Sequence, residues 1–191
     1  LMTVYKLVWD DFCSWYLEIV KPAYQQPIDR ATYEATISFF ENLMKLLHPF
    51  MPFLTEEIWH MLREREEGDD IIIAQLPELH RSNNKIIKAF EKAEDVIIGI
   101  RKVRADKNIP NKERIALKLQ KGKHDESYFY PVVSKLGNIL NIEEVEEKPA
   151  NAITFIVGAQ EYYIPLSDSI DVEAEVTKLN EELNYTEGFL R

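Results

Sequence analysis

Apolar side chains recur at steps of three and four residues through most of the first 110 positions, and this spacing is typical of amphipathic helices. Pro22 ends the first of these patterns, and Asp29 is placed to cap the second. The third fades near Gly68, and Pro110 ends the fourth. The predicted helices cover residues 1–19, 29–47, 54–67 and 83–109.

The link between the second and third predicted helices contains Pro49 and Pro52. Proline lacks an amide donor and disfavours helical angles at the residue before it, so the second helix must stop at Leu47. The third helix then begins either with Thr55 as its N-cap or with Pro52 in its first turn. We expect this turn to be wedged into a helical core, because its side chains are too apolar for an exposed loop: Phe50, Met51, Phe53, Leu54, Ile58 and Trp59.

Beyond Pro110 the apolar pattern changes from a period of 3.6 to a period of 2. Residues 115–119 alternate as a half-buried strand does, residues 126–140 return to helical spacing, and two further strands are predicted over 152–157 and 162–166. From Ile170 the apolar steps alternate between three and four, which predicts a heptad seam through Val172, Val176, Leu179, Leu183 and Leu190.

The expected fold class is therefore mainly α. We predict a helical-bundle domain over residues 1–112, followed by a small α/β domain over 113–168. The remaining residues, 169–191, are expected to start a C-terminal coiled-coil arm that is truncated here.

Composition favours a globular, soluble protein, because 46% of the 191 residues are hydrophobic. The single cysteine, Cys13, excludes an internal disulfide framework and indicates a reducing compartment, so we expect a cytoplasmic protein. No apolar run approaches the roughly 20 residues that span a bilayer, and Asp10 and Asp11 argue against a signal peptide. A start at Leu1, with a helical pattern already under way, suggests a piece of a longer polypeptide.

The net charge of −10 argues against a phosphate-binding protein, but the charge is unevenly distributed. Residues 81–123 hold thirteen Lys or Arg against five Asp or Glu, which gives this segment a net charge of +8. Such asymmetry indicates a basic binding face on an acidic chain. The alternative is that these lysines only solvate the outside of a long helix.

The sequence predicts no catalytic or metal site within these residues. Its six glycines never cluster into a phosphate-binding loop, and its four histidines form no pair at metal-ligand spacing. Carboxylates at Asp10 and Asp11, and at Glu56 and Glu57, are adjacent in sequence and so diverge around a helix.

One group of residues is spaced for nucleic-acid binding. Arg101, Arg104 and Asn108 follow one another at steps of three and four near the end of the fourth predicted helix, with Lys102 and Lys107 beside them. Guanidinium groups bind phosphates, and asparagine can read a base edge. The alternative is that the arginines tie this helix to acidic neighbours.

Four motifs resemble those of class I aminoacyl-tRNA synthetases. Residues 9–18 with Lys21-Pro22 resemble the first helix of their anticodon-binding domain, and residues 47–59 resemble the turn shared by the valine, isoleucine and leucine enzymes. Residues 100–104 with 108–110 are similar to the end of the fourth helix, and residues 164–166 with 171–175 to the entry of a coiled-coil arm. The arm favours the valine branch of the family.

This resemblance implies an anticodon-binding domain that recognises tRNA as part of a ligase, with no catalytic site and no cofactor in these residues. ATP and magnesium are expected to serve the full-length enzyme, which we expect to be monomeric and not bound to a membrane. The resemblance implies tRNA contacts at Arg101, Lys102, Arg104, Lys107 and Asn108. An isolated chain is expected to self-associate through its truncated heptad helix. The isoleucine and leucine branches, and a helical protein-interaction module without tRNA binding, remain alternatives.

Overall fold

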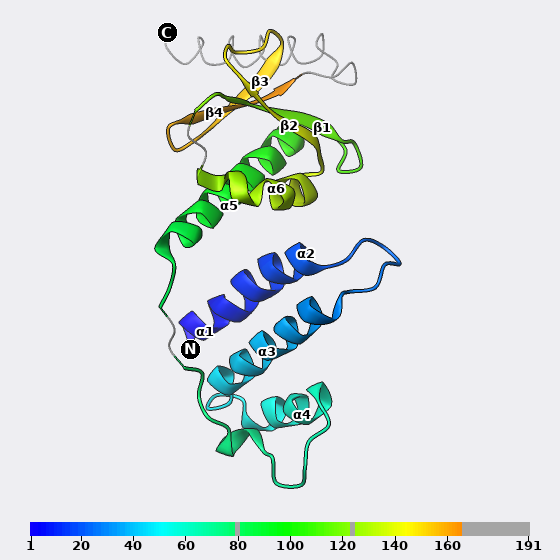
Figure 1. The fold of residues 1–191 in the computed structure, drawn as a ribbon, viewed down its shortest axis with the longest axis vertical. Helices are drawn as coiled ribbons and strands as arrows, with labels where there is room; N and C mark the ends of the chain where they lie inside the picture. Colours follow the sequence, from blue (N-terminus) through cyan, green and yellow to red (C-terminus); the bar gives the residue numbers. More distant parts are fainter. Residues whose placement is uncertain (79–80, 123–124, 166–191) are drawn as a thin grey trace, which may run out of the picture. The chain divides into compact units, whose positions relative to one another are not determined.

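The computed structural model describes residues 1–78, 81–122 and 125–165 (Figure 1). Its elements are mainly helical, with one four-stranded mixed sheet, and this agrees with the mainly α class predicted from the sequence. The predicted coiled-coil arm over 169–191 lies outside the described residues. The chain divides into two compact units, Leu1–Ser82 and Asn83–Arg191.

The first unit is helical, and α1, η1 and α2 follow one another directly over residues 2–20 as one nearly continuous rod. Within that rod the amide of Leu17 donates to the carbonyl of Phe12, five residues back, as in a π-helix. Asp29 caps the next helix as predicted, because its Oδ1 accepts a hydrogen bond of 2.9 Å from the amide of Thr32. The elements are α1 (Met2–Lys6), η1 (Leu7–Tyr16), α2 (Leu17–Val20), α3 (Arg30–Leu47), α4 (Pro52–Leu62) and η2 (Ile71–Ile73).

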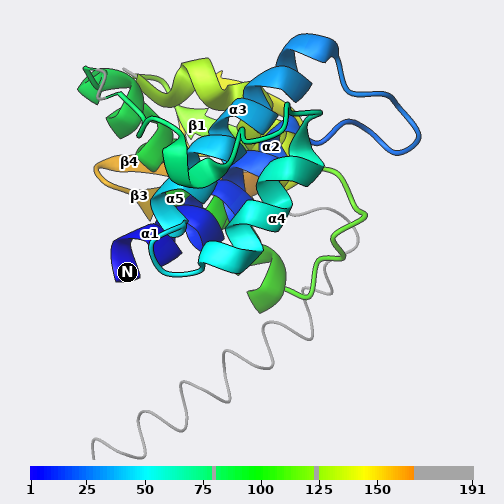
Figure 2. The same cartoon turned by 90° about the horizontal axis from the view of Figure 1, so that it is seen from below.

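The core of this unit lies where the rod, α3 and α4 meet, and α3 and α4 are neighbours in both views (Figure 1, Figure 2). The Phe12 ring stacks on Phe40 of α3, with centroids 5.5 Å apart. Five buried side chains form the centre: Phe12, Leu43, Met44, Trp59 and Ile71. This core confirms that the first three predicted helices bury their apolar stripes together.

The proline turn before α4 differs from the prediction. Pro52 is the first residue of α4, whereas Thr55 lies inside the helix, fully buried, with its hydroxyl 2.7 Å from His48 Nδ1. Four of the six apolar side chains are exposed, most strongly Phe53 at 90%, and the other three of these four are Phe50, Met51 and Leu54. The prediction that the turn is wedged into the core was therefore wrong for these four, whereas Trp59 is buried in the core and Ile58 packs against it, because α4 turns that face inward.

The second unit is a sheet with helices packed on it. The strand order is β2-β1-β4-β3; β1 pairs parallel with β2 and antiparallel with β4, and β3 and β4 form a hairpin. Ile115, Leu117 and Leu119 of β1 are buried in alternation, which confirms the predicted period of 2. The elements are α5 (Asn84–Asp106), β1 (Ile115–Gln120), η3 (Asp125–Phe129), α6 (Tyr130–Gly137), β2 (Ile139–Val145), β3 (Ala152–Val157) and β4 (Gln160–Pro165).

Helix α5 packs on α6, η3 and β3, and it therefore belongs to this compact unit. The compact units divide at Ser82, within the predicted helical-bundle domain 1–112, because the buried stripe of α5 faces α6, η3 and β3; the domain boundary at 112 stays a prediction. Asn83 caps α5, its side chain accepting from the amides of Lys85 and Ile86. Gly99 is required in α5, because a Cβ there would lie 2.5 Å from the ring of Phe155.

Strand β2 was not predicted. Helical spacing was predicted over residues 126–140, but α6 ends at Gly137, and Asn138 adopts a left-handed conformation with φ of 50°. From Ile139 the chain pairs with β1, and such a parallel partner is invisible to local spacing. The β1-α6-β2 crossover sets the end of α6 beside the end of α5.

Candidate functional site

The end of α5 carries all five residues that the sequence pointed to, but the structure divides them. Arg101, Lys102 and Asn108 are exposed and Lys107 is half-buried. Arg104 is buried, with only 4% of its surface exposed. It lies four residues after Ile100, which is fully buried, so it continues the inward stripe of α5.

The guanidinium of Arg104 bonds to backbone carbonyls at the ends of three segments. It donates to Pro110 O at 3.0 Å, to Glu113 O at 2.9 Å, to Gly137 O at 3.1 and 3.3 Å, and to Asn138 O at 3.1 Å. Burial lowers the pKa of this guanidinium, and the negative charge of Glu113 partly opposes that shift. Arg104 is therefore a structural residue, and the prediction that it contacts tRNA is corrected.

Asn108 also has a structural explanation. Its φ is 52°, in the left-handed region that asparagine tolerates better than most residues. The next amide, of Ile109, donates to Arg104 O at 2.8 Å, and the amide of Asn108 donates to Ala105 O at 3.3 Å. These two bonds form the Schellman motif that closes a helix C-terminus, so the helix end accounts for an asparagine at this position.

The three remaining cations fall on two clefts. Lys102 and Lys107 line a cleft of about 570 Å³ between α5 and β3, together with the carboxylates Asp95 and Asp106. Arg101 lines a different cleft, of about 650 Å³, beside Arg104 and the end of α6. The structure thus brings Lys102 and Lys107 together and places Arg101 on a neighbouring surface.

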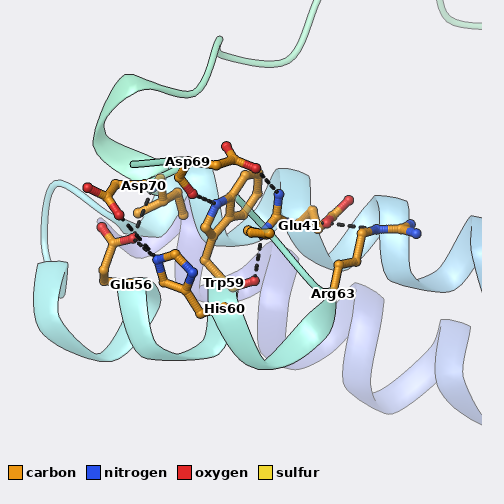
Figure 3. Close-up of polar contacts among 9 residues, drawn as sticks. Glu41, Glu56, Trp59, His60, Arg63, Asp69 and Asp70 are labelled. Carbon is orange, nitrogen blue, oxygen red and sulfur yellow. Dashed lines mark hydrogen bonds and ion pairs between the residues drawn. The ribbon is translucent and has the colours of Figure 1, made fainter. Parts of the chain in front are cut away.

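The first unit contains a polar network that was not predicted from the sequence (Figure 3). Residues 63–67 were expected to form the charged end of a helix. Arg63 pairs with Glu34 and Glu41 at 2.9 Å each, so that the segment after α4 is held to α3. Arg65 lies 3.5 Å above the centre of the Trp59 ring and also pairs with Glu41. The adjacency of basic and acidic residues was a signal of pairing, but their partners on α3 are more than 20 positions away.

A second cluster at α4 combines a histidine with two carboxylates. His60 Nε2 lies 3.2 Å from Glu56 and 3.2 Å from Asp70, and Glu56 also accepts the amide of Ile71 (Figure 3). The ligand-type atoms of the three side chains lie within 4.8 Å of one another. Their mutual hydrogen bonds, which join α4 to the loop before η2, account for the arrangement.

Among the described residues, no helix is both long and apolar enough to cross a membrane. Residues 1–120 match the anticodon-binding domain of tRNA ligase. The chain belongs to this family. The matched range covers the whole first unit together with α5 and β1, so it includes all five residues predicted to contact tRNA. The resemblance inferred from the motifs is thereby confirmed.

Relatives with high identity carry one name. The chain is 51% identical over 190 residues to the valine–tRNA ligase of Parabacteroides distasonis, and 49% identical over 191 residues to that of Christiangramia forsetii. A more distant relative, the valine–tRNA ligase of Fervidobacterium nodosum, is 33% identical over 94% of the chain. The chain spans 22% of the length of the first two relatives and 21% of the third.

Proposed function

We propose that this chain recognises valine tRNA as part of a ligase that joins valine to that tRNA using ATP. The observation that carries the proposal is the match of residues 1–120 to the anticodon-binding family, together with valine–tRNA ligases as relatives along the whole chain. The chemistry of amino-acid activation then belongs to other parts of the full-length protein. ATP and magnesium are assigned to those parts, because the glycines of this chain form no phosphate-binding loop.

The tRNA-contacting face that we propose consists of Arg101, Lys102 and Lys107. Each can present its charge to a phosphate, since the first two are exposed and the third is half-buried. Arg104 supports this face from beneath, because it fixes the end of α5 against the end of α6. Asn108 shapes the same surface through its left-handed backbone, and its side chain remains exposed there.

The proposal has four further parts. A coiled-coil arm begins at residue 169 and contacts the body of the tRNA. The full-length protein is a monomer. It acts in the cytoplasm. The isolated chain associates with a second copy through the heptad positions of that arm.

The test is to measure binding of valine tRNA and of a non-cognate tRNA to the 191-residue chain across salt concentrations. Removing two phosphate-contacting cations in the double variant Arg101→Ala, Lys102→Ala should reduce the salt slope by about two units and weaken both tRNAs. The matched control is Lys118→Ala, Lys121→Ala, which removes two positive charges at residues already paired with Glu143 and Glu146. If the wild-type chain binds neither tRNA, or binds both with equal affinity, the proposal that it recognises valine tRNA is contradicted.

The variant Asn108→Gly tests whether residue 108 only closes the end of α5 or whether its side chain also reads a base. Glycine adopts the left-handed conformation without strain, so the helix end should persist and stability should change by less than about 1 kcal/mol. If the side chain reads a base, the variant loses about 1 to 3 kcal/mol of affinity for the cognate tRNA alone. We expect unchanged discrimination between the two tRNAs in the same titrations.

A further inference from the structure

A second basic surface lies at the start of α5, away from the residues discussed so far. Lys85, Lys88 and Lys92 follow one another at steps of three and four and therefore share one face of the helix. With Tyr128 and Phe129 of η3 they line a cleft of about 540 Å³. We call this cleft the lysine–tyrosine groove; its lining residues are Lys85, Ile86, Lys88, Ala89, Lys92, Tyr128 and Phe129.

The aromatic wall of the groove has a fixed support and an open face. Phe129 packs edge-on against Phe90 of α5, with ring centroids 5.2 Å apart, and Tyr128 packs edge-on against Phe129 at the same separation. Tyr128 is nevertheless 80% exposed. An aromatic ring that is held in place but left uncovered is suited to stack on a flat, aromatic partner.

One of the three lysines fixes the groove and does not add charge to it. Lys92 Nζ lies 2.8 Å from the carboxylate of Glu126, which is fully buried. Hydrogen bonds from Lys92 and Tyr162 hold the pKa of Glu126 below its ordinary value, although its burial alone would raise that pKa. This ion pair locks η3 onto α5 two residues before Tyr128.

Lys85 and Lys88 supply the positive charge of the groove. Both are exposed, and neither forms an ion pair with any acidic side chain in the part of the chain that the structure describes. Lys85 also lies in the first turn of α5, where the helix dipole disfavours a cation. Helix stability therefore does not account for this lysine, whereas an anionic partner does.

We propose that the lysine–tyrosine groove binds a single-stranded stretch of RNA. Lys85 and Lys88 hold adjacent phosphates, and one base stacks on Tyr128. An acidic peptide would satisfy the lysines but has no need of the exposed ring, so the combination favours RNA. The groove lies at the opposite end of α5 from Arg101 and Lys102 and is a separate surface. The proposal rests on the proposed function only in naming tRNA as the natural RNA.

The experiment titrates the 191-residue chain with two probes, a ten-nucleotide oligouridylate and transcribed valine tRNA, at several salt concentrations. The double variant Lys85→Ala, Lys88→Ala should lower the oligouridylate salt slope by about 1.4 units, as expected for two phosphates on a single strand. Tyr128→Ala should weaken binding by about 5- to 100-fold while leaving the slope unchanged, since it removes only a stacking contact. These side chains are exposed, so their loss leaves the fold intact, which circular dichroism verifies.

The matched control is Lys118→Ala, Lys121→Ala, which removes the same charge at residues already paired with Glu143 and Glu146. It should alter neither probe. If oligouridylate does not bind, or binds all variants equally, the groove is not an RNA site, whether or not tRNA binds. If the groove variants weaken oligouridylate binding but the chain does not bind tRNA, the RNA-binding groove is supported and the proposed function is contradicted. Polyglutamate that displaces oligouridylate and depends on the lysines with no effect of Tyr128→Ala identifies a peptide site and overturns the RNA assignment.

Discussion

Among the residues that the structure describes, each of the two units holds one nearly buried arginine, and the two arginines differ in the kind of acceptor they bond to. Arg65, in the first unit, has 9% of its side chain exposed and pairs with the carboxylates of Glu41 and Asp69 while covering the Trp59 ring. Arg104, in the second unit, donates only to backbone carbonyls. The first arginine is balanced by formal charges, and the second by dipoles at the end of a helix.

The difference teaches what each arginine contributes. Of the two carboxylates that pair with Arg65, Asp69 is about half exposed, so it is screened by salt and can be hydrated when the arginine is removed, whereas Glu41 is only 14% exposed. Three of the bonds from Arg104 go to Gly137 and Asn138 at the end of α6, and the side-chain amide of Asn138 adds hydrogen bonds to Asn111 O and Glu113 O at the same junction. Arg104 thus organises a fold junction, whereas Arg65 clamps a loop onto a helix pair.

The largest expected effect is that of Arg104→Ala. Removing the guanidinium takes this donor from the carbonyls of Pro110, Gly137 and Asn138 at a buried position, while Glu113 O keeps a hydrogen bond from Asn138 Nδ2, and we expect a loss of about 3–5 kcal/mol in the free energy of unfolding. Arg104→Lys should recover less than half of this loss, because an ammonium group cannot span the four acceptors. Hydrogen exchange of peptides from α5 and β1 measures the change. A loss below about 1 kcal/mol would show that water replaces the arginine.

A smaller effect is expected for Arg65→Ala, at about 1.5–3 kcal/mol, from lost charged hydrogen bonds and the stacking on Trp59. All three tryptophans, Trp9, Trp15 and Trp59, lie within Leu1–Ser82, so their fluorescence follows the first unit selectively. Urea titrations followed by this fluorescence should show a loss that shrinks in high salt. The same salt series should leave the Arg104→Ala loss unchanged, and equal salt sensitivity in both variants would refute the contrast.

The smallest effect is expected for Glu126→Gln and concerns the stability of the second unit at low pH. The pKa of Glu126 is held below its ordinary value of 4.5, so its folded form contributes stability above that pH, and this stability is lost as pH falls through the lowered value. Glu126→Gln should therefore flatten the decline in stability of the second unit as the pH falls below about 4.5. Hydrogen exchange in β4 and α5 follows this decline. The first unit, followed by tryptophan fluorescence, provides the internal control, since its acid response should be identical in the variant and the wild type.

The predicted elements succeeded where a local signal sets the backbone. Asp29 accepts the amide of Thr32 at the start of α3, as its position before an apolar stripe indicated, and α5 begins next to the predicted start at residue 83. The alternation of β1 needed only its own residues to be recognised. Strand β2 was not predicted, because no local signal marks it. Its apolar residues Ile139, Ile142 and Val145 recur every three positions, as in a helix, and they form a strand because β1 offers a parallel partner.

The sequence by itself determined the cap at Asp29, the end of α3 at Leu47, the strands β1, β3 and β4, the basic character of residues 81–123 and the family, because caps, prolines, alternation and motifs act within a few residues. Only the tertiary structure decided that Arg104 turns inward while Arg101 stays exposed, although the two lie three residues apart on the same predicted face. The physical reason is that the inward face of α5 is chosen by what packs on it. Carbonyls at Gly137 and Asn138, more than 30 positions away, offer Arg104 acceptors that no local pattern contains.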